Sequence, residues 1–304
     1  MDTPLDTLLK TANTVILGKA HQIRLAVCCL LAKGHLLIED VPGVGKTVLS
    51  HTLANLLGLQ YQRIQFTSDL LPADIVGSSI FDGKTNSFRF QPGPVFHQMI
   101  LADEINRSTP KAQSALLEAM EEHQVTVEGK TRPLPEPFFV IATQNPTTQI
   151  GTFPLPESQL DRFLMRIELG YPDSGSERSL LKGEERHALV ERLPVCLQPD
   201  ELQELQDQVK QVFVSEALLD YLQDLIRFSR ESGSYQAGLS PRAGLALLNA
   251  AKAWALIDRR EAVLPEDVQA VLPAVAGHRL HASESGGSGG QGVVFPLLTQ
   301  VAIP

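Results

Sequence analysis

The sequence is poor in cysteine and has no excess of positive charge, and each shortage argues against a class of protein. Its three cysteines are an odd number, with Cys28 and Cys29 adjacent and Cys196 alone. This pattern is no disulfide framework, and we expect buried thiols. Lysine and arginine total 26 against 35 acidic residues, a formal charge of −9. Because nucleic-acid backbones require clustered basic residues, this balance argues against a dedicated nucleic-acid surface.

Long apolar runs are also missing. The longest strongly apolar run, residues 23–32, contains Arg24 and is too short to span a bilayer. The N-terminus carries Asp2 and Asp6 where a signal peptide would be basic. We therefore expect a cytoplasmic protein with no membrane span. With 304 residues, the chain is large enough for a well-buried core and lies on the border between one domain and two.

A phosphate-binding pattern is present between a predicted strand and a predicted helix. The segment DVPGVGKT, residues 40–47, follows an apolar strand that ends at Glu39, and a helical pattern begins at Lys46. In such loops, backbone N–H groups and the helix N-terminus converge on phosphate oxygens. The lysine supplies positive charge, and the hydroxyl of Thr47 would face Mg²⁺. The sequence therefore predicts a nucleotide site.

The loop departs from the usual pattern at its first position. Asp40 stands where a glycine is common, whereas Gly43 and Gly45 remain. Pro42 fixes φ and stiffens the turn, so the loop can form without the first glycine. The alternative is a purely structural turn between a strand and a helix. The complete GKT triplet in a strand-to-helix setting favours nucleotide binding.

Hydrophobic periodicity predicts alternating strands and helices in the first half of the chain, which implies a parallel sheet covered by helices. Two helices, 5–17 and 20–33, precede the first strand, and further helices begin at Lys46 and Pro110. Short alternating runs around Asp82-Gly83 and around Gly129 predict two inserted hairpins, the first with core-facing aromatics as its simplest interpretation. The predicted strands are 35–39, 61–66, 97–102, 138–143 and 164–169.

A change in composition at residues 170–176, GYPDSGS, predicts a domain boundary. Residues 177–280 have helical patterns, which indicate a small helical bundle. Residues 283–292 are a flexible linker by composition. The apolar, β-prone tail after them is either a strap packed on the body or a segment exchanged between subunits, and we favour the strap.

Two carboxylates end the third predicted strand, at Asp103 and Glu104. Hydrolysis of a nucleoside triphosphate requires a group that holds Mg²⁺ and a group that orients water. Side chains alternate along a strand, so one carboxylate can face the metal and the next the water. A solvated strand end is the alternative. Asn145 and Arg162 follow strands that we expect to flank this one. Asn145 could instead cap a turn before Pro146. Arg162 could instead pair with Asp161.

Six motifs follow one another along the chain: DVPGVGKT at 40–47, QFTSDLLPADIVG at 65–77, LADEINR at 101–107, PKAQSALLEAMEE at 110–122, ATQNP at 142–146 and LPESQLDRF at 155–163. In these motifs and their order, the chain resembles the MoxR family of AAA+ ATPases over about residues 5–280. Asp40 is itself usual in the loop of that family. The resemblance implies an α/β AAA+ P-loop NTPase core with a parallel sheet and inserted β-hairpins, followed by an all-α lid.

The resemblance also implies domain limits. The core would span 1–172, with a helix-2 insert at about 77–97 and a pre-sensor-1 hairpin at about 123–137, elements that face the central pore in related machines. The lid would span 173–282, and a linker with an apolar tail 283–304.

Site roles follow from the same resemblance. ATP and Mg²⁺ are the implied cofactors, and Thr47 and Asp103 are the implied Mg²⁺ residues. Glu104 would polarise water, Asn145 resembles sensor 1, and Arg162 resembles an arginine finger that acts on a neighbour's nucleotide. Arg242 resembles sensor 2, although a helix-start arginine on a solvated face is the simpler interpretation. The implied nucleotide-binding residues are Asp40, Val41, Pro42, Gly43, Val44, Gly45, Lys46, Thr47 and Val48.

We expect ATP hydrolysis coupled to chaperone-like remodelling or activation of partner complexes. The implied partners are other copies of the chain in a head-to-tail ring, expected to be a hexamer, a von Willebrand factor type A domain adaptor and an unknown protein client. Two alternatives stay open, a DNA-associated motor and a nucleotide-gated scaffold with low turnover. His278 and His281 are a close pair, but no third ligand is near, and we expect a solvated helix end.

Overall fold

The computed structural model describes residues 3–145, 152–183, 189–283 and 291–303. Backbone contacts divide the chain into two compact units. Unit 1 comprises residues 1–23, 37–162 and 168–199, and unit 2 comprises 24–36, 163–167 and 200–304. In the described part of the chain, no helix has the length and hydropathy needed to cross a membrane.

A five-stranded sheet has the order β2-β5-β8-β1-β9. The pairs β2–β5 and β5–β8 are parallel, as the alternating pattern predicts. The strand β5 is buried along its whole length, which matches its continuous apolar run. The bounds are β1 Leu36–Glu39, β2 Tyr61–Gln65, β5 Met99–Asp103, β8 Phe139–Gln144 and β9 Met165–Ile167.

Some helices of unit 1 begin at a residue whose side chain caps the helix. Thr3 and Asp6 form a capping box at α1, and Thr109 caps α5 ahead of Pro110. The buried side of α5 includes Leu116 and Met120, which are four residues apart. The helices are α1 Pro4–Val15, α3 Lys46–Leu56, α4 Pro72–Val76, α5 Pro110–Glu122, α6 Glu157–Leu160 and α7 Ser174–Lys182.

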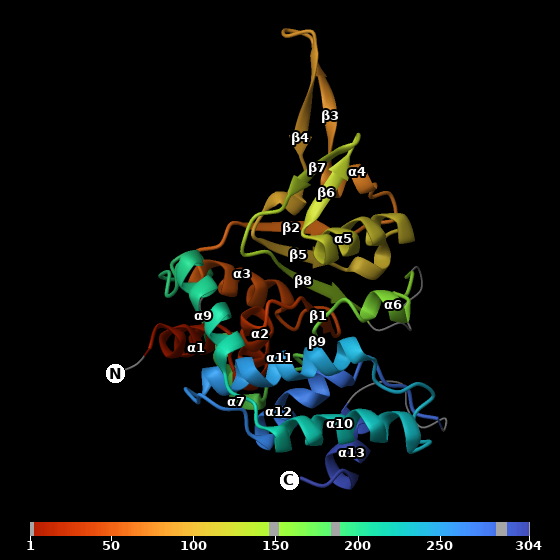
Figure 1. Cartoon of the computed structure of the whole chain (residues 1–304). Coiled ribbons are helices and arrows are strands. Elements are labelled where there is room, and N and C mark those ends of the chain that lie inside the picture. Colours follow the sequence, from red (N-terminus) through yellow and green to blue (C-terminus); the bar gives the residue numbers. More distant parts are fainter. Residues whose placement is uncertain (1–2, 146–151, 184–188, 284–290, 304) are drawn as a thin grey trace. The chain divides into compact units, whose positions relative to one another are not determined.

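Two antiparallel hairpins interrupt the βα alternation of unit 1, as predicted (Figure 1). The first pairs β3 (Gly77–Asp82) with β4 (Ser87–Pro92), and the second pairs β6 (Gln124–Val127) with β7 (Lys130–Pro133). They touch near the base of the first. Ser79 Oγ donates to Glu128 Oε2 at 2.6 Å, and the Arg132 guanidinium lies 3.8 Å from the Phe90 ring centroid.

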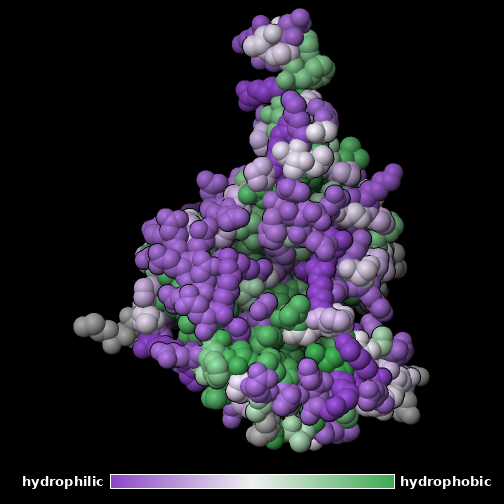
Figure 2. All heavy atoms as spheres, in the orientation of Figure 1, coloured by the Kyte–Doolittle hydropathy of each residue, from purple (hydrophilic) through white to green (hydrophobic). Residues whose placement is uncertain are grey.

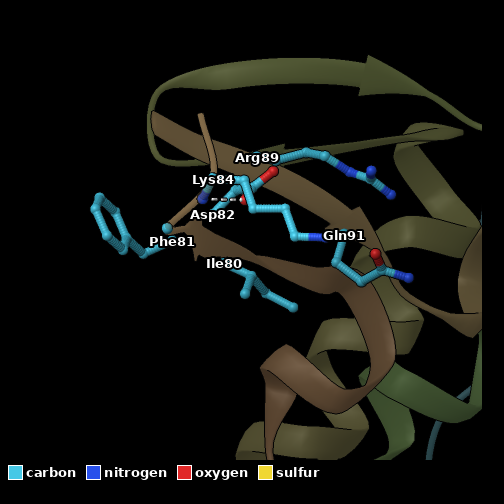
Figure 3. Close-up of a pocket in the computed structure, with 7 residues that line it drawn as sticks. Ile80, Phe81, Asp82, Lys84, Arg89 and Gln91 are labelled. Carbon is cyan, nitrogen blue, oxygen red and sulfur yellow. Dashed lines mark hydrogen bonds between the residues drawn. The ribbon is translucent and has the colours of Figure 1, made fainter. Parts of the chain in front are cut away.

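The outer half of the β3–β4 hairpin does not fit the simpler interpretation of this segment, because its aromatic side chains do not face the core. Phe81 and Phe88 are 53% and 74% exposed, and their ring centroids are 5.4 Å apart. Figure 2 shows apolar residues on this projecting part of unit 1. Strand alternation sends Phe81 to one side and Arg89 and Gln91 to the other, as Figure 3 shows.

Unit 2 is mainly helical, and its residues 200–280 have the helical character that the periodicity of residues 177–280 predicts, whereas α7 belongs to unit 1. Ser215 and Ser240 cap α10 and α11 through their side chains. Buried residues of α11 pack against α12. Residues 20–23 of α2 belong to unit 1 and the rest to unit 2. The helices are α2 Ala20–Leu31, α9 Pro199–Gln211, α10 Glu216–Glu231, α11 Pro241–Ile257, α12 Pro265–Ala276 and α13 Gln291–Gln300.

The C-terminal tail packs on the body of unit 2, but as the helix α13 and not in a β conformation. Val294 and Leu297 are buried, and α13 contacts α10 and α12. Tyr235 Oη donates to Val293 O at 2.9 Å. Most of the predicted linker, residues 284–290, lies outside the described residues. Its predicted last two residues, 291 and 292, belong to α13.

Two further expectations need correction. Cys28 and Cys29 are buried as predicted, but Cys196 is half-buried. His278 is buried, not on a solvated helix end, and its Nε2 lies 3.1 Å from Phe163 O. Among the described residues, no group of three histidine, cysteine or acidic side chains could hold a metal ion by itself.

Candidate functional site

The loop between β1 and α3 has the geometry of a phosphate cradle. Gly43 and Gly45 have φ values of +85° and +96°, a backbone region that favours glycine. A Cβ atom at either position would meet no heavy atom within 4 Å, so space is open beside the loop. Gly45 is the N-cap of α3 and has no side chain to cap it. The N–H groups at the start of this helix are therefore suited to an anionic ligand.

Asp40 stabilises the loop through both of its carboxylate oxygens. Oδ1 accepts the backbone N–H of Val41 at 2.7 Å, and Oδ2 accepts the N–H of Gly170 at 2.5 Å. The backbone of Asp40 is itself bonded to Gln144 O at 3.2 Å. The residue that departs from the usual loop pattern thus ties the loop to the chain that follows β9.

Lys46 points back across the loop from the first turn of α3. Its Nζ donates to Asp40 O at 2.6 Å and to Asn145 Oδ1 at 3.4 Å. Burial lowers the pKa of Lys46, and the nearby carboxylates of Asp40, Asp103 and Glu104 oppose that shift. A buried ammonium with no carboxylate in direct contact among the described residues is suited to an incoming anion.

Asp103 is the last residue of β5 and is 8% exposed. Thr143 Oγ1 donates to its Oδ1 at 2.6 Å. Arg63, from β2, donates to its Oδ2 through Nε at 3.1 Å and Nη2 at 2.6 Å. The parallel register places Gln65 beside Asp103 and Ala142 beside Ala102, which brings the ends of β2, β5 and β8 together.

Glu104 lies just beyond the strand, with a left-handed backbone at φ 55°. For a residue other than glycine this conformation is strained, and such strain is concentrated at functional sites. Its Oε1 accepts Asn145 Nδ2 at 3.1 Å. Its Oε2 accepts Gln65 Nε2 at 3.1 Å and Arg107 Nη1 at 2.9 Å. Three donors therefore fix the carboxylate beside the loop.

The strand that follows Arg162, β9, does not flank the strand of Asp103 as expected. In the sheet, β9 is next to β1, and β5 has β2 and β8 as neighbours. Arg162 Nη1 pairs with Glu121 Oε2 at 2.7 Å and donates to Leu117 O at 2.7 Å. The side chain therefore pairs with α5, and its ion pair is with Glu121, whereas the sequence suggested Asp161.

Arg242 is the second residue of α11 and belongs to unit 2. The other predicted catalytic residues, Glu104, Asn145 and Arg162, belong to unit 1 together with the loop. Within unit 1 the structure brings Lys46, Asn145 and Glu104 into one hydrogen-bonded group.

The sequence did not identify several residues of this group. Arg63 and Gln65 alternate on β2, so both side chains lie on one face of the strand, and Arg63 Nη2 donates to Gln65 Oε1 at 2.6 Å. Thr143 joins both carboxylate residues, because its Oγ1 also accepts the N–H of Glu104 at 2.9 Å. The alternation of polar residues at 63 and 65 was the signal that could have indicated them.

The residues present fit a nucleotide and Mg²⁺. Mg²⁺ usually takes one or two protein oxygens together with phosphate oxygens and water, not a closed protein cage. Asp103 and the hydroxyl of Thr47 are such oxygen donors, and the open loop with Lys46 is suited to the phosphates. The bound metal would neutralise phosphate charge and orient the oxygens around it.

Comparisons with known proteins agree with this geometry. The protein-family model described as "ATPase family associated with various cellular activities (AAA)" matches residues 35–165. The family model of the AAA lid domain matches residues 227–292. The uncharacterized protein YeaC of Bacillus subtilis is 44% identical over 96% of this chain and 92% of its own. Chaperone MoxR1 of Mycobacterium tuberculosis is 40% identical over 91% of this chain and 75% of its own.

A solved structure extends the likeness to the fold. A crystal structure of a protein assigned as an ATPase, from Cytophaga hutchinsonii, has a TM-score of 0.89 and 36% identity. The match covers 99% of this chain and 95% of that one. The fold is therefore that of an AAA+ core with an AAA lid, as the sequence predicts. The chain belongs to the MoxR family of AAA+ ATPases.

Proposed function

We propose that the protein hydrolyses ATP with Mg²⁺ at the loop of residues 40–48 and uses the energy to remodel partner proteins. The observation that carries the proposal is the group formed by Lys46, Asn145 and Glu104 beside an open glycine loop. A buried cation, an amide and a strained carboxylate within hydrogen-bond reach are the groups that in-line attack of water on a γ-phosphate requires.

Each residue has a distinct proposed role. Lys46 and the N–H groups at the start of α3 hold the phosphates, and Thr47 and Asp103 hold the metal. Asn145 positions the γ-phosphate or the water. Glu104 accepts a hydrogen bond from the attacking water and orients it. Among the described residues, Glu104 Oε1 accepts a single hydrogen bond, from Asn145 Nδ2, so one of its lone pairs is left for the water.

Arg162 and Arg242 complete the proposed site. Arg162 acts in trans on the nucleotide of an adjacent copy, and Arg242 contacts the nucleotide from the lid. A head-to-tail contact of this kind either closes into a ring or continues as a helix, and we propose a hexameric ring. Hydrolysis would move the lid relative to the core and so change the interface between copies.

The remodelling activity is supported by the β3–β4 hairpin. Its exposed Phe81 and Phe88 are apolar side chains on a projecting element, and such exposure is typical of interaction sites. We propose that the two hairpins contact the protein client in the centre of the ring. A von Willebrand factor type A domain protein is the proposed adaptor.

A DNA motor is the first rival, and the formal charge of −9 speaks against it. A binding scaffold with little turnover is the second. The strained backbone of Glu104 and its position beside Asn145 favour hydrolysis over simple binding.

The test is a trap variant. Glu104→Gln is expected to bind ATP but to lose nearly all turnover, so that ATP and client stay bound together. Affinity purification of this variant with ATP should recover a protein partner that the Lys46→Ala variant does not recover. Recovery of nucleic acid alone would support the DNA motor, and unchanged turnover would refute the assignment of Glu104.

A further inference from the structure

One nitrogen of the Arg162 guanidinium is held by two acceptors on α5. Nη1 contacts the carboxylate of Glu121 and the carbonyl oxygen of Leu117, each at 2.7 Å. These two residues are four apart on the helix, so they lie on the same face one turn apart. The Arg162 and Glu121 side chains are 29% and 36% exposed, so the pair lies at the surface of unit 1.

The other edge of the guanidinium is open. Arginine has five N–H donors in a planar fork, and Nη1 carries two of them. Within residues 3–145, 152–183, 189–283 and 291–303, neither Nε nor Nη2 of Arg162 has a hydrogen-bond partner. A planar cation fixed at one nitrogen presents its remaining edge in a set direction. That edge has the geometry that binds two oxygens of a carboxylate or phosphate.

We infer that Glu121 is a positioning residue for Arg162. Together with the Leu117 carbonyl, Glu121 fixes the plane of the guanidinium so that the Nε–Nη2 edge faces the phosphates of the nucleotide bound by an adjacent copy. This inference rests on the proposed function, because it requires Arg162 to act in trans. Glu121 touches no nucleotide; it acts through Arg162.

A purely structural role of Glu121 and a positioning role predict different results when Glu121 is removed. Exposed ion pairs typically contribute about 0.2 to 1 kcal/mol, so a purely structural Glu121 predicts that its removal changes little. A positioning role predicts a loss of rate with unchanged ATP affinity. The P-loop of the same copy is untouched, whereas the neighbour's transition state loses a correctly placed cation.

The experiment compares steady-state ATP hydrolysis and fluorescent ATP binding in four purified single-substitution variants and one double variant. Glu121→Ala is expected to lower kcat by about 10- to 100-fold, since small misplacement of a catalytic group costs up to about 100-fold. Glu121→Gln keeps an acceptor and should lose less. Glu122→Ala removes the same charge one residue further along α5 and should behave as wild type. Arg162→Ala is the reference for complete loss of the arginine.

Two results separate this inference from the proposed function. If Arg162→Ala keeps wild-type turnover, the trans role itself fails. If Arg162→Ala loses turnover but Glu121→Ala keeps it, only the positioning role is overturned. Adding Glu121→Ala to Arg162→Ala should cause no further loss, because the two residues act as one unit. An additive loss, or an equal fall in ATP affinity, would also overturn the inference; thermal unfolding checks that the variants are folded.

Discussion

Arg63 donates two hydrogen bonds to a single oxygen of Asp103, at 3.1 Å from Nε and 2.6 Å from Nη2. Asp103 is the carboxylate proposed to hold Mg²⁺, so a protein cation already occupies the oxygen that faces away from Thr143. Mg²⁺ that binds with the nucleotide therefore either displaces Arg63 from this oxygen or shares the oxygen with it. The arginine side chain is 49% exposed, which limits the strength of the competition.

Removing this arginine should make the metal bind more readily. We expect Arg63→Met to lower the Mg²⁺ concentration that gives half-maximal binding of fluorescent ADP by about fivefold, the equivalent of roughly 1 kcal/mol for a half-exposed pair. Arg89→Met, on the β3–β4 hairpin, is the matched control and should leave the Mg²⁺ dependence unchanged. A higher Mg²⁺ requirement in Arg63→Met would mean that the arginine supports the metal site.

Asp40→Gly tests whether the departure from the usual loop pattern is functional. The substitution restores the common glycine but removes the acceptor of the Val41 and Gly170 N–H groups. Hydrogen bonds to charged groups contribute about 1.5 to 3 kcal/mol each, so we expect a clear loss of thermal stability. Nucleotide affinity should fall about tenfold, roughly 1.4 kcal/mol. Asp40→Asn keeps one carbonyl acceptor and should lie between; improved binding in Asp40→Gly would contradict the role given to Asp40.

His278 should make unit 2 sensitive to acid. Burial lowers the pKa of His278, and the nearby Arg279 and Arg166 add to the shift, so the folded protein holds the ring neutral. Above the unfolded pKa of about 6.5, the ring is neutral in both the folded and the unfolded protein, so the free energy of unfolding does not depend on it. Below that pH, only the unfolded protein binds the proton, and the free energy of unfolding falls by at most about 1.4 kcal/mol per pH unit.

The measurement is urea unfolding at pH 7.5 and 5.5. His278→Gln keeps an amide donor for Phe163 O but cannot titrate in this range, so its midpoint should fall less than that of wild type between the two values. An equal fall in both proteins would show that His278 does not titrate on unfolding.

Local sequence predicted the loop, both hairpins and the strands to within two residues at each end, because each has a short signature in glycine, proline or alternating apolar residues. It could not predict partners set by strand register. Arg63 and Asp103 are 40 residues apart, and their contact depends on the pairing of β2 with β5. The pairing of Arg162 with Glu121 likewise crosses to another element. These are the contacts that complete the candidate site.

One alternative and one expectation from the sequence differ from the structure for the same physical reason. The simpler interpretation of the first hairpin, with core-facing aromatics, is wrong for its outer half, because alternation indicates a face but not what covers it. The tail was assigned β character from its branched residues, yet Val293, Val294, Leu297 and Val301 are the buried positions of α13 and the residue after it. Tertiary contacts, or their lack, determine both the exposure of the hairpin aromatics and the conformation of the tail. Local sequence propensity carries no information about such contacts.

Mixing two inactive variants tests the central claim most directly. Lys46→Ala should fail to bind ATP but still offers Arg162 to a neighbour, whereas Arg162→Ala binds ATP but offers no arginine. Each alone is expected to lose turnover, by about 10³- to 10⁵-fold for the arginine. If the site is shared between copies, ATP hydrolysis should reappear when the two are mixed and allowed to exchange subunits. Turnover that stays absent after subunit exchange has been verified would contradict a site completed in trans.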